Sequence, residues 1–94
     1  MAITFALPNA LVPYSGGRST VTLGGGRYRT VADALGALAA SHAGVVDRVM
    51  DERGEVRQHV NVFVDGESIR FAEGLDTPVR EDSTIMIVAA VSGG

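Results

Sequence analysis

Hydrophobic and polar residues alternate with a period of two at residues 19–23, where Val21 and Leu23 share one face. This period predicts a half-buried β-strand. Residues 2–7 are apolar and rich in residue types that favour strands, so they predict a second one. The prolines and glycines of residues 8–17 predict a loop between the two. We therefore expect the chain to begin with a β-hairpin.

The hydrophobic period lengthens to that of an amphipathic α-helix over residues 31–41. Thr30 is expected to cap this helix, with Asp33 near its N-terminus, where a negative charge is favourable. The apolar face of the helix holds Val31, Ala34, Leu35 and Leu38. A helix of about three turns with one apolar face is suited to covering one side of a small sheet.

Two glycines affect how this helix packs and where it ends. Gly36 lies inside the helix, where it either costs about 1 kcal/mol relative to alanine or permits close approach to the sheet. Gly44 fits the stop that glycine often provides at a helix C-terminus. Residues 45–50 are then expected to form a short second helical turn.

Alternation returns at residues 57–64 and predicts the third strand. Its inward face is expected to hold Val60, Val62 and Val64. Phe63 then lies on the opposite face. The Asp-Gly pair at 65–66 is typical of a type I′ hairpin turn, so residues 67–71 are expected to return as a short strand. Residues 72–82 predict a loop.

The last strand, residues 84–90, is the most hydrophobic, so we expect it at the centre of the sheet, between the first strand and the third. Ile85 and Ile87 are expected to point inward, and Met86 and Val88 outward. The order of elements predicts an α+β fold. A mixed sheet of about five strands is covered by one main helix, within a single domain of residues 1–94.

Phe63, Met86 and Val88 are then expected to form an apolar patch beside the root of the C-terminal residues. Exposed apolar patches often mark partner surfaces, although a two-sided or partly covered sheet would also explain this one. Arg70 is a further candidate for partner binding through an acidic group. Pairing of Arg70 within its own loop is the structural alternative, and the one we favour.

Composition narrows the chemistry that the chain can perform. It has 94 residues, no Cys and no Lys, so all eight basic residues are Arg. The chain therefore offers no thiol for catalysis, disulfides or metal binding, and no side-chain amine. The net charge of −3 gives no basic face for nucleic acid or an acidic membrane surface. His42 and His59, without Cys or a spaced carboxylate, predict no metal site.

The expected location is the cytoplasm. The longest apolar run, residues 85–91, is far short of the roughly 18–20 residues that span a bilayer. The first residues show no basic segment ahead of an apolar stretch, unlike a signal peptide.

The sequence closes with Val91, Ser92, Gly93 and Gly94 directly after the last strand. Four residues reach at most about 13–14 Å, and the glycines have no Cβ, so this tail can thread a narrow channel. The carboxylate of Gly94 lies at its tip. Because the chain has no Cys, this carboxylate is its one position for transferable sulfur, provided that sulfur is the cargo. A frayed terminus is the simple alternative.

Residues 60–94 resemble the ThiS/MoaD family of sulfur carriers. The resemblance rests on the V-N-V-F-V strand at 60–64, Glu67, I-R-F at 69–71, G-L-x-T at 74–77, Asp82 and A-V-x-G-G at 90–94. It is looser over residues 1–59. The closest match is to the carrier type of cysteine synthesis. Molybdopterin synthase small subunits usually approach the tail through aromatic residues and proline, and Val88-Ala89-Ala90 departs from that pattern.

This resemblance implies a ubiquitin-like β-grasp fold with a flexible C-terminal Gly-Gly tail. It implies that an E1-like enzyme, using ATP and Mg²⁺, adenylates Gly94, and that the product becomes a thiocarboxylate. A biosynthetic enzyme of cysteine or thio-natural-product synthesis then accepts the sulfur. The chain would itself be a carrier and not an enzyme, would bind no cofactor and would be a monomer when free. A molybdopterin synthase small subunit, a ubiquitin-like protein modifier and a non-covalent β-grasp binding module remain as alternatives.

Overall fold

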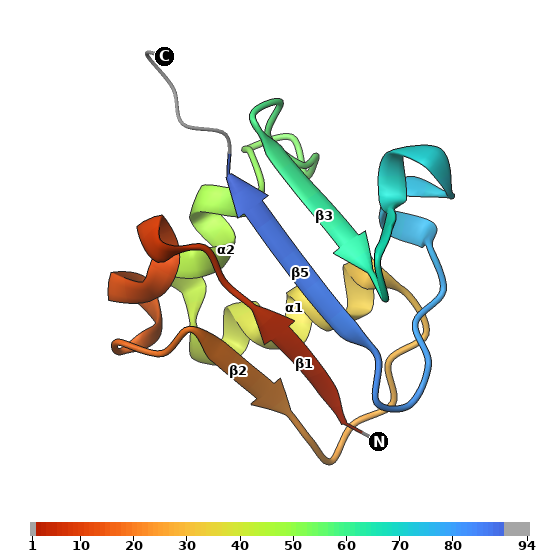
Figure 1. Ribbon diagram of the computed structural model, residues 1–94, viewed down its shortest axis with the longest axis horizontal. Helices are drawn as coiled ribbons and strands as arrows, with labels where there is room; N and C mark the ends of the chain where they lie inside the picture. The colour runs from red at the N-terminus through yellow and green to blue at the C-terminus, as the bar shows by residue number, and fades with distance from the viewer. Residues whose placement is uncertain (1, 90–94) are drawn as a thin grey trace.

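The computed structural model describes residues 2–89, in which five strands form one mixed sheet in the order β2-β1-β5-β3-β4 (Figure 1). β1 and β5 run parallel, and the other neighbouring strands run antiparallel. The strands are β1 (Ile3–Ala6), β2 (Thr20–Leu23), β3 (Val60–Val64), β4 (Glu67–Ser68) and β5 (Thr84–Ala89). The α+β arrangement expected from the sequence is confirmed.

Two α-helices cover one face of the sheet and lie behind it in Figure 1. They are α1 (Val31–Ser41) and α2 (Ala43–Val49). Three short 3₁₀ helices complete the described chain: η1 (Asn9–Ser15), η2 (Ile69–Phe71) and η3 (Gly74–Asp76). The face toward the viewer is covered by no helix of the described residues. We call it the open face.

β5 occupies the centre of the sheet, as its hydrophobicity predicted (Figure 1). Ile85 and Ile87 are fully buried beneath the helices. Phe5 of β1 is directly opposite Ile85 and is equally buried. The core around them includes Val60, Val62 and Val64 of β3 and Val31, Ala34, Leu35 and Leu38 of α1. The last strand is therefore held by packing on one face and by a neighbouring strand on each side.

α1 begins where the sequence predicted, because Thr30 and Asp33 form a reciprocal cap. The Thr30 hydroxyl accepts a hydrogen bond from the Asp33 backbone N–H at 3.2 Å, and the Asp33 carboxylate accepts one from the Thr30 N–H at 3.2 Å. These bonds satisfy backbone donors that a helix N-terminus leaves free.

The interpretation of Gly44 was wrong, and one of the two interpretations of Gly36 is excluded. α1 ends at Ser41 and the backbone turns at His42, so Gly44 is not the helix stop but the second residue of α2. A Cβ on Gly44 would lie 3.4 Å from the Tyr14 ring, which is an ordinary van der Waals contact. Gly36 is exposed, and a Cβ on it would meet no atom within 4 Å, so it does not serve close approach to the sheet.

Replacing Gly36 with alanine is expected to stabilise the fold by about 0.5–1 kcal/mol, because glycine loses more backbone entropy in a helix and the new methyl group meets open space. Urea unfolding followed by circular dichroism measures this. As a contrast, Gly66→Ala should destabilise the fold, since Gly66 has a φ of +91°. A lower midpoint for Gly36→Ala would contradict this account of the helix.

The loops contain more structure than the sequence predicted. Residues 8–17, expected as a loop, contain η1, which Gly16 closes with a φ of +73°. Residues 69–71 form η2 and not the end of a strand, because the Ser68 hydroxyl accepts a hydrogen bond from the Arg70 N–H and turns the chain. β3 begins at Val60, three residues later than predicted, after a turn.

The Asp65–Gly66 turn is confirmed, with φ values of 48° and 91°. The Asp65 carboxylate also accepts hydrogen bonds from the Thr84 N–H and the Ser83 hydroxyl, both at 2.9 Å. These bonds tie the β3–β4 hairpin to the start of β5.

Candidate functional site

The sheet fixes the point from which the C-terminal residues leave. Ala89, the last described residue, pairs with Val60 of β3, while the pairing of β5 with β1 ends at Met86. The proposed working residues Val91, Ser92, Gly93 and Gly94 lie outside the described residues. What the structure establishes is the root of this tail, at the C-terminal end of the central strand.

The predicted apolar patch lies on the open face beside this root. Met86 and Val88 are 42% and 37% exposed and point away from the helices, as predicted. Phe63 of β3 is directly opposite Met86 and is half-buried. We call Phe63, Met86 and Val88 the apolar patch. The outward placement is confirmed, and the partner-binding role stays a prediction.

The open face becomes polar toward the start of β5. Thr4 of β1 lies between Thr22 of β2 and Thr84 of β5. The Thr4 and Thr22 hydroxyls are 3.3 Å apart and share a hydrogen bond. Because this threonine row is polar, the apolar patch is confined to the part of the face that leads to the tail.

Arg70 is engaged within its own chain. Its Nε donates to the Asn61 side-chain oxygen at 3.2 Å, and its Nη2 donates to the Val60 carbonyl at 2.8 Å and to the Gln58 carbonyl at 3.4 Å. The guanidinium therefore satisfies the free edge of β3, where β4 is too short to pair. The use is structural, as we favoured, but the partners are an amide and backbone carbonyls at residues 58–61 and not an acidic group of the Arg70 loop. A contact with a partner protein stays a prediction.

A pair of residues that the sequence did not single out lies on the other side of the root. The Arg48 guanidinium of α2 stacks over the Tyr14 ring of η1, 3.6 Å from its centroid. Both side chains line an open cleft of about 260 Å³ that is also bordered by Ala89. Its other lining residues are Ala10, Leu11, His59 and Val60. No hydrophobic period relates positions 14 and 48, so the sequence pattern could not predict that these two side chains meet.

The electrostatics of the loop before β3 are set by backbone hydrogen bonds. The Asp51 carboxylate accepts bonds from the Glu55 N–H at 3.0 Å and the Arg53 N–H at 2.9 Å. These bonds, with the nearby charges of Arg53 and Arg57, lower the pKa of Asp51 below its usual value. Asp51 therefore holds this turn together.

Two features are absent from residues 2–89, a metal-binding cluster and a membrane-spanning helix. No group of three or more His, Cys, Asp or Glu side chains there is close enough to hold a metal ion. None of the helices in this range has the length and apolar character needed to cross a bilayer.

The sheet order with both helices on one face is that of the ubiquitin-like β-grasp fold. The sequence profile of the ThiS family matches residues 12–94, and a curated sulfur carrier aligns over the whole chain. The chain belongs to the ThiS family. The resemblance noted in residues 60–94 is thus confirmed and extends through most of residues 1–59.

Three relatives illustrate the match. Sulfur carrier protein CysO of Mycobacterium tuberculosis is 34% identical over 100 aligned residues, which cover all of both chains. The Amycolatopsis orientalis BexX/CysO complex contains a chain with a TM-score of 0.85 and 30% identity, covering 98% of this chain and 99% of that one. SAMP1 from Haloferax volcanii, a small archaeal modifier protein, has a TM-score of 0.83 and 29% identity, covering all of both chains.

Proposed function

We propose that this chain is a sulfur carrier whose Gly94 carboxylate is adenylated by an E1-like enzyme and then converted to a thiocarboxylate. The observation that carries this proposal is the alignment with a sulfur carrier, which covers 100% of both chains at 34% identity. The central position of β5 adds support, because it gives the tail a firmly held root. The proposal places the chain in the cytoplasm, where ATP is available.

The chemistry balances in two steps. A Gly94 carboxylate oxygen attacks the α-phosphorus of ATP, pyrophosphate leaves, and an acyl-adenylate forms. A sulfide-level sulfur from a donor then attacks the acyl carbon, and AMP leaves with the carboxylate oxygen. ATP and Mg²⁺ belong to the activating enzyme, so this chain acts as a co-substrate.

The resulting thiocarboxylate would pass its sulfur to a second enzyme. The likeness to CysO chains favours an acceptor in cysteine synthesis or in another biosynthetic reaction that forms a carbon–sulfur bond. The BexX/CysO complex supports a role in partner binding, because it contains a chain 30% identical to this one. We propose that this chain likewise binds an activating enzyme and an acceptor enzyme in turn.

ATP–pyrophosphate exchange tests the first step. The chain is mixed with each E1-like enzyme encoded in the same genome, with ATP, Mg²⁺ and labelled pyrophosphate. We expect label to enter ATP only when both the chain and one such enzyme are present. Absence of chain-dependent exchange with every one of these enzymes would overturn the proposal.

Met86→Glu should weaken binding to the activating enzyme, since it places a charge at the centre of the apolar patch. We expect the KM for the carrier in the exchange assay to rise about 30-fold, as for a central interface residue. Thr20→Glu is the matched control, because Thr20 is exposed on the far edge strand of the same face. Equal KM values for the two variants would show that the apolar patch is not a partner surface.

A protein modifier is the second candidate, favoured by the structural likeness to a small archaeal modifier protein. In that case the activated Gly94 would form an amide with an amine of a target protein. Conjugates that persist on denaturing gels under reducing conditions would distinguish this function from sulfur transfer.

A further inference from the structure

The contact between η1 and α2 creates a flat aromatic and cationic surface. The Arg48 guanidinium lies over the Tyr14 ring, and its Nη1 donates a hydrogen bond to the Gly44 carbonyl at 3.1 Å. The ring lies against α2 beside Gly44, where a Cβ would be 3.4 Å from it, an ordinary van der Waals contact. Tyr14 remains 42% exposed and Arg48 is exposed. Both groups are thus held in place yet remain open to a partner.

This surface borders the root of the tail. Tyr14, Arg48 and Ala89 line the same cleft, and Ala89 is the residue from which the tail continues. Five residues follow Ala89, and they can span at most about 17 Å. An enzyme that holds Gly94 in its active site must therefore bring the mouth of its tail channel close to Ala89, and with it to Tyr14 and Arg48.

The cleft beside the tail root is lined by one Arg, Arg48, and by no carboxylate, although the whole chain carries −3. Stacking on Tyr14 and bonding to a carbonyl neutralise none of the Arg48 charge. Arg57 lies close to the same helix, because its Nε and Nη2 donate to the Asp47 carbonyl at 3.2 and 3.0 Å. The Asp51 carboxylate is occupied by backbone N–H groups of its own turn. The group on a partner that would complement the Arg48 guanidinium is a carboxylate.

We propose that the stacked Tyr14–Arg48 pair docks against an acidic rim around the tail channel of the adenylating enzyme. This inference rests on the proposed function. A guanidinium stacked on a ring keeps its remaining N–H groups in one plane, where they can bind a carboxylate in a bidentate manner. The apolar patch and this pair lie on two sides of the tail root, so together they orient the tail as it enters the channel.

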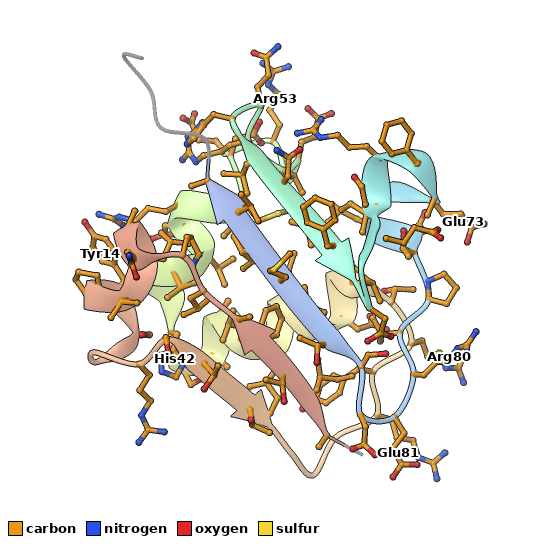
Figure 2. The ribbon with its side chains drawn as sticks, in the orientation of Figure 1. Tyr14, His42, Arg53, Glu73, Arg80 and Glu81 are labelled. Carbon is orange, nitrogen blue, oxygen red and sulfur yellow. The ribbon has the colours of Figure 1, made fainter. Side chains whose placement is uncertain are left out.

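Charge reversal tests the proposal in the exchange assay. Arg48→Glu should raise the KM for the carrier about tenfold and leave kcat unchanged, because it removes one ion pair and adds repulsion at the rim. Arg80→Glu makes the same charge change on the side of the molecule away from Tyr14 (Figure 2) and should stay within about twofold of wild type. Circular dichroism and thermal unfolding check that both variants are folded.

Two further comparisons separate docking from a structural effect. Tyr14→Ala removes the ring on which Arg48 stacks and should raise KM about threefold. Raising the ionic strength should increase the wild-type KM more steeply than that of Arg48→Gln. Equal KM values for Arg48→Glu, Arg80→Glu and wild type would overturn the docking inference alone. Absence of exchange with the wild-type chain would overturn the proposed function as well.

Discussion

Removing Gly93 and Gly94 is expected to abolish adenylation. The deletion withdraws the terminal carboxylate by about 7 Å from the position it would reach in the activating enzyme. Since a misplacement of about 1 Å can cost 100-fold in rate, we expect exchange activity to fall by more than that. The exchange assay with the activating enzyme measures the loss.

The control for this deletion is a measurement of folding stability. The buried core cluster of the described residues extends from Ile3 to Ile87. The truncated chain should therefore unfold at the same urea concentration as the full chain. A truncated chain that keeps wild-type exchange would show that the tail is not the working part.

Phe5→Ala is expected to cost about 3–5 kcal/mol of folding free energy. Phe5 is fully buried at the centre of β1, directly opposite Ile85 of β5 and Val21 of β2. The loss is a large share of the roughly 5–15 kcal/mol that stabilises a domain of ordinary size. Because β1 is one of the two strands that hold β5, the same change should also loosen the root of the tail.

Urea unfolding measures the effect, and Phe5→Leu provides the comparison. Leucine keeps most of the buried volume, so its cost should be clearly smaller than that of alanine. A cost below about 1 kcal/mol for Phe5→Ala would contradict the central role of this residue in the core.

The elements predicted correctly from the sequence are those in which one local pattern and the final packing agree. The valines of β3 alternate because one face of the strand is buried, and that period is visible in the chain. Thr30 and Asp33 are three residues apart, so their cap is also a local signal. The central place of β5 followed from its hydrophobicity, since a strand between two neighbours has little contact with water.

The errors occur where contacts between distant segments decide the conformation. Gly44 was taken as a helix stop, but the chain turns at His42, between α1 and α2, and Gly44 lies within α2. Local hydrogen bonding by Ser68 ended β4 early and produced η2 in place of a longer strand. Arg70 bonds to Asn61 and to two carbonyls near β3, a set of partners that becomes visible only once the hairpin is folded.

The parts of the candidate site also differ in whether a local sequence pattern predicts them. The apolar patch followed from strand alternation, because Phe63 opposes Met86 once β3 and β5 pair. The Tyr14–Arg48 pair did not, because its members come from a loop and a helix that share no period. The tail residues were singled out by their chemistry, and their role rests on the proposed function.

Fragmentation mass spectrometry of the intact chain tests the central claim most directly. The chain is incubated with the activating enzyme, ATP, Mg²⁺ and a sulfide donor, and the product is fragmented from its C-terminus. We expect a mass gain that corresponds to the exchange of one oxygen atom for one sulfur atom, carried by every fragment that contains Gly94 and by no fragment that lacks it. An unchanged mass in a reaction that consumes ATP, or sulfur located on any other residue, would contradict the account.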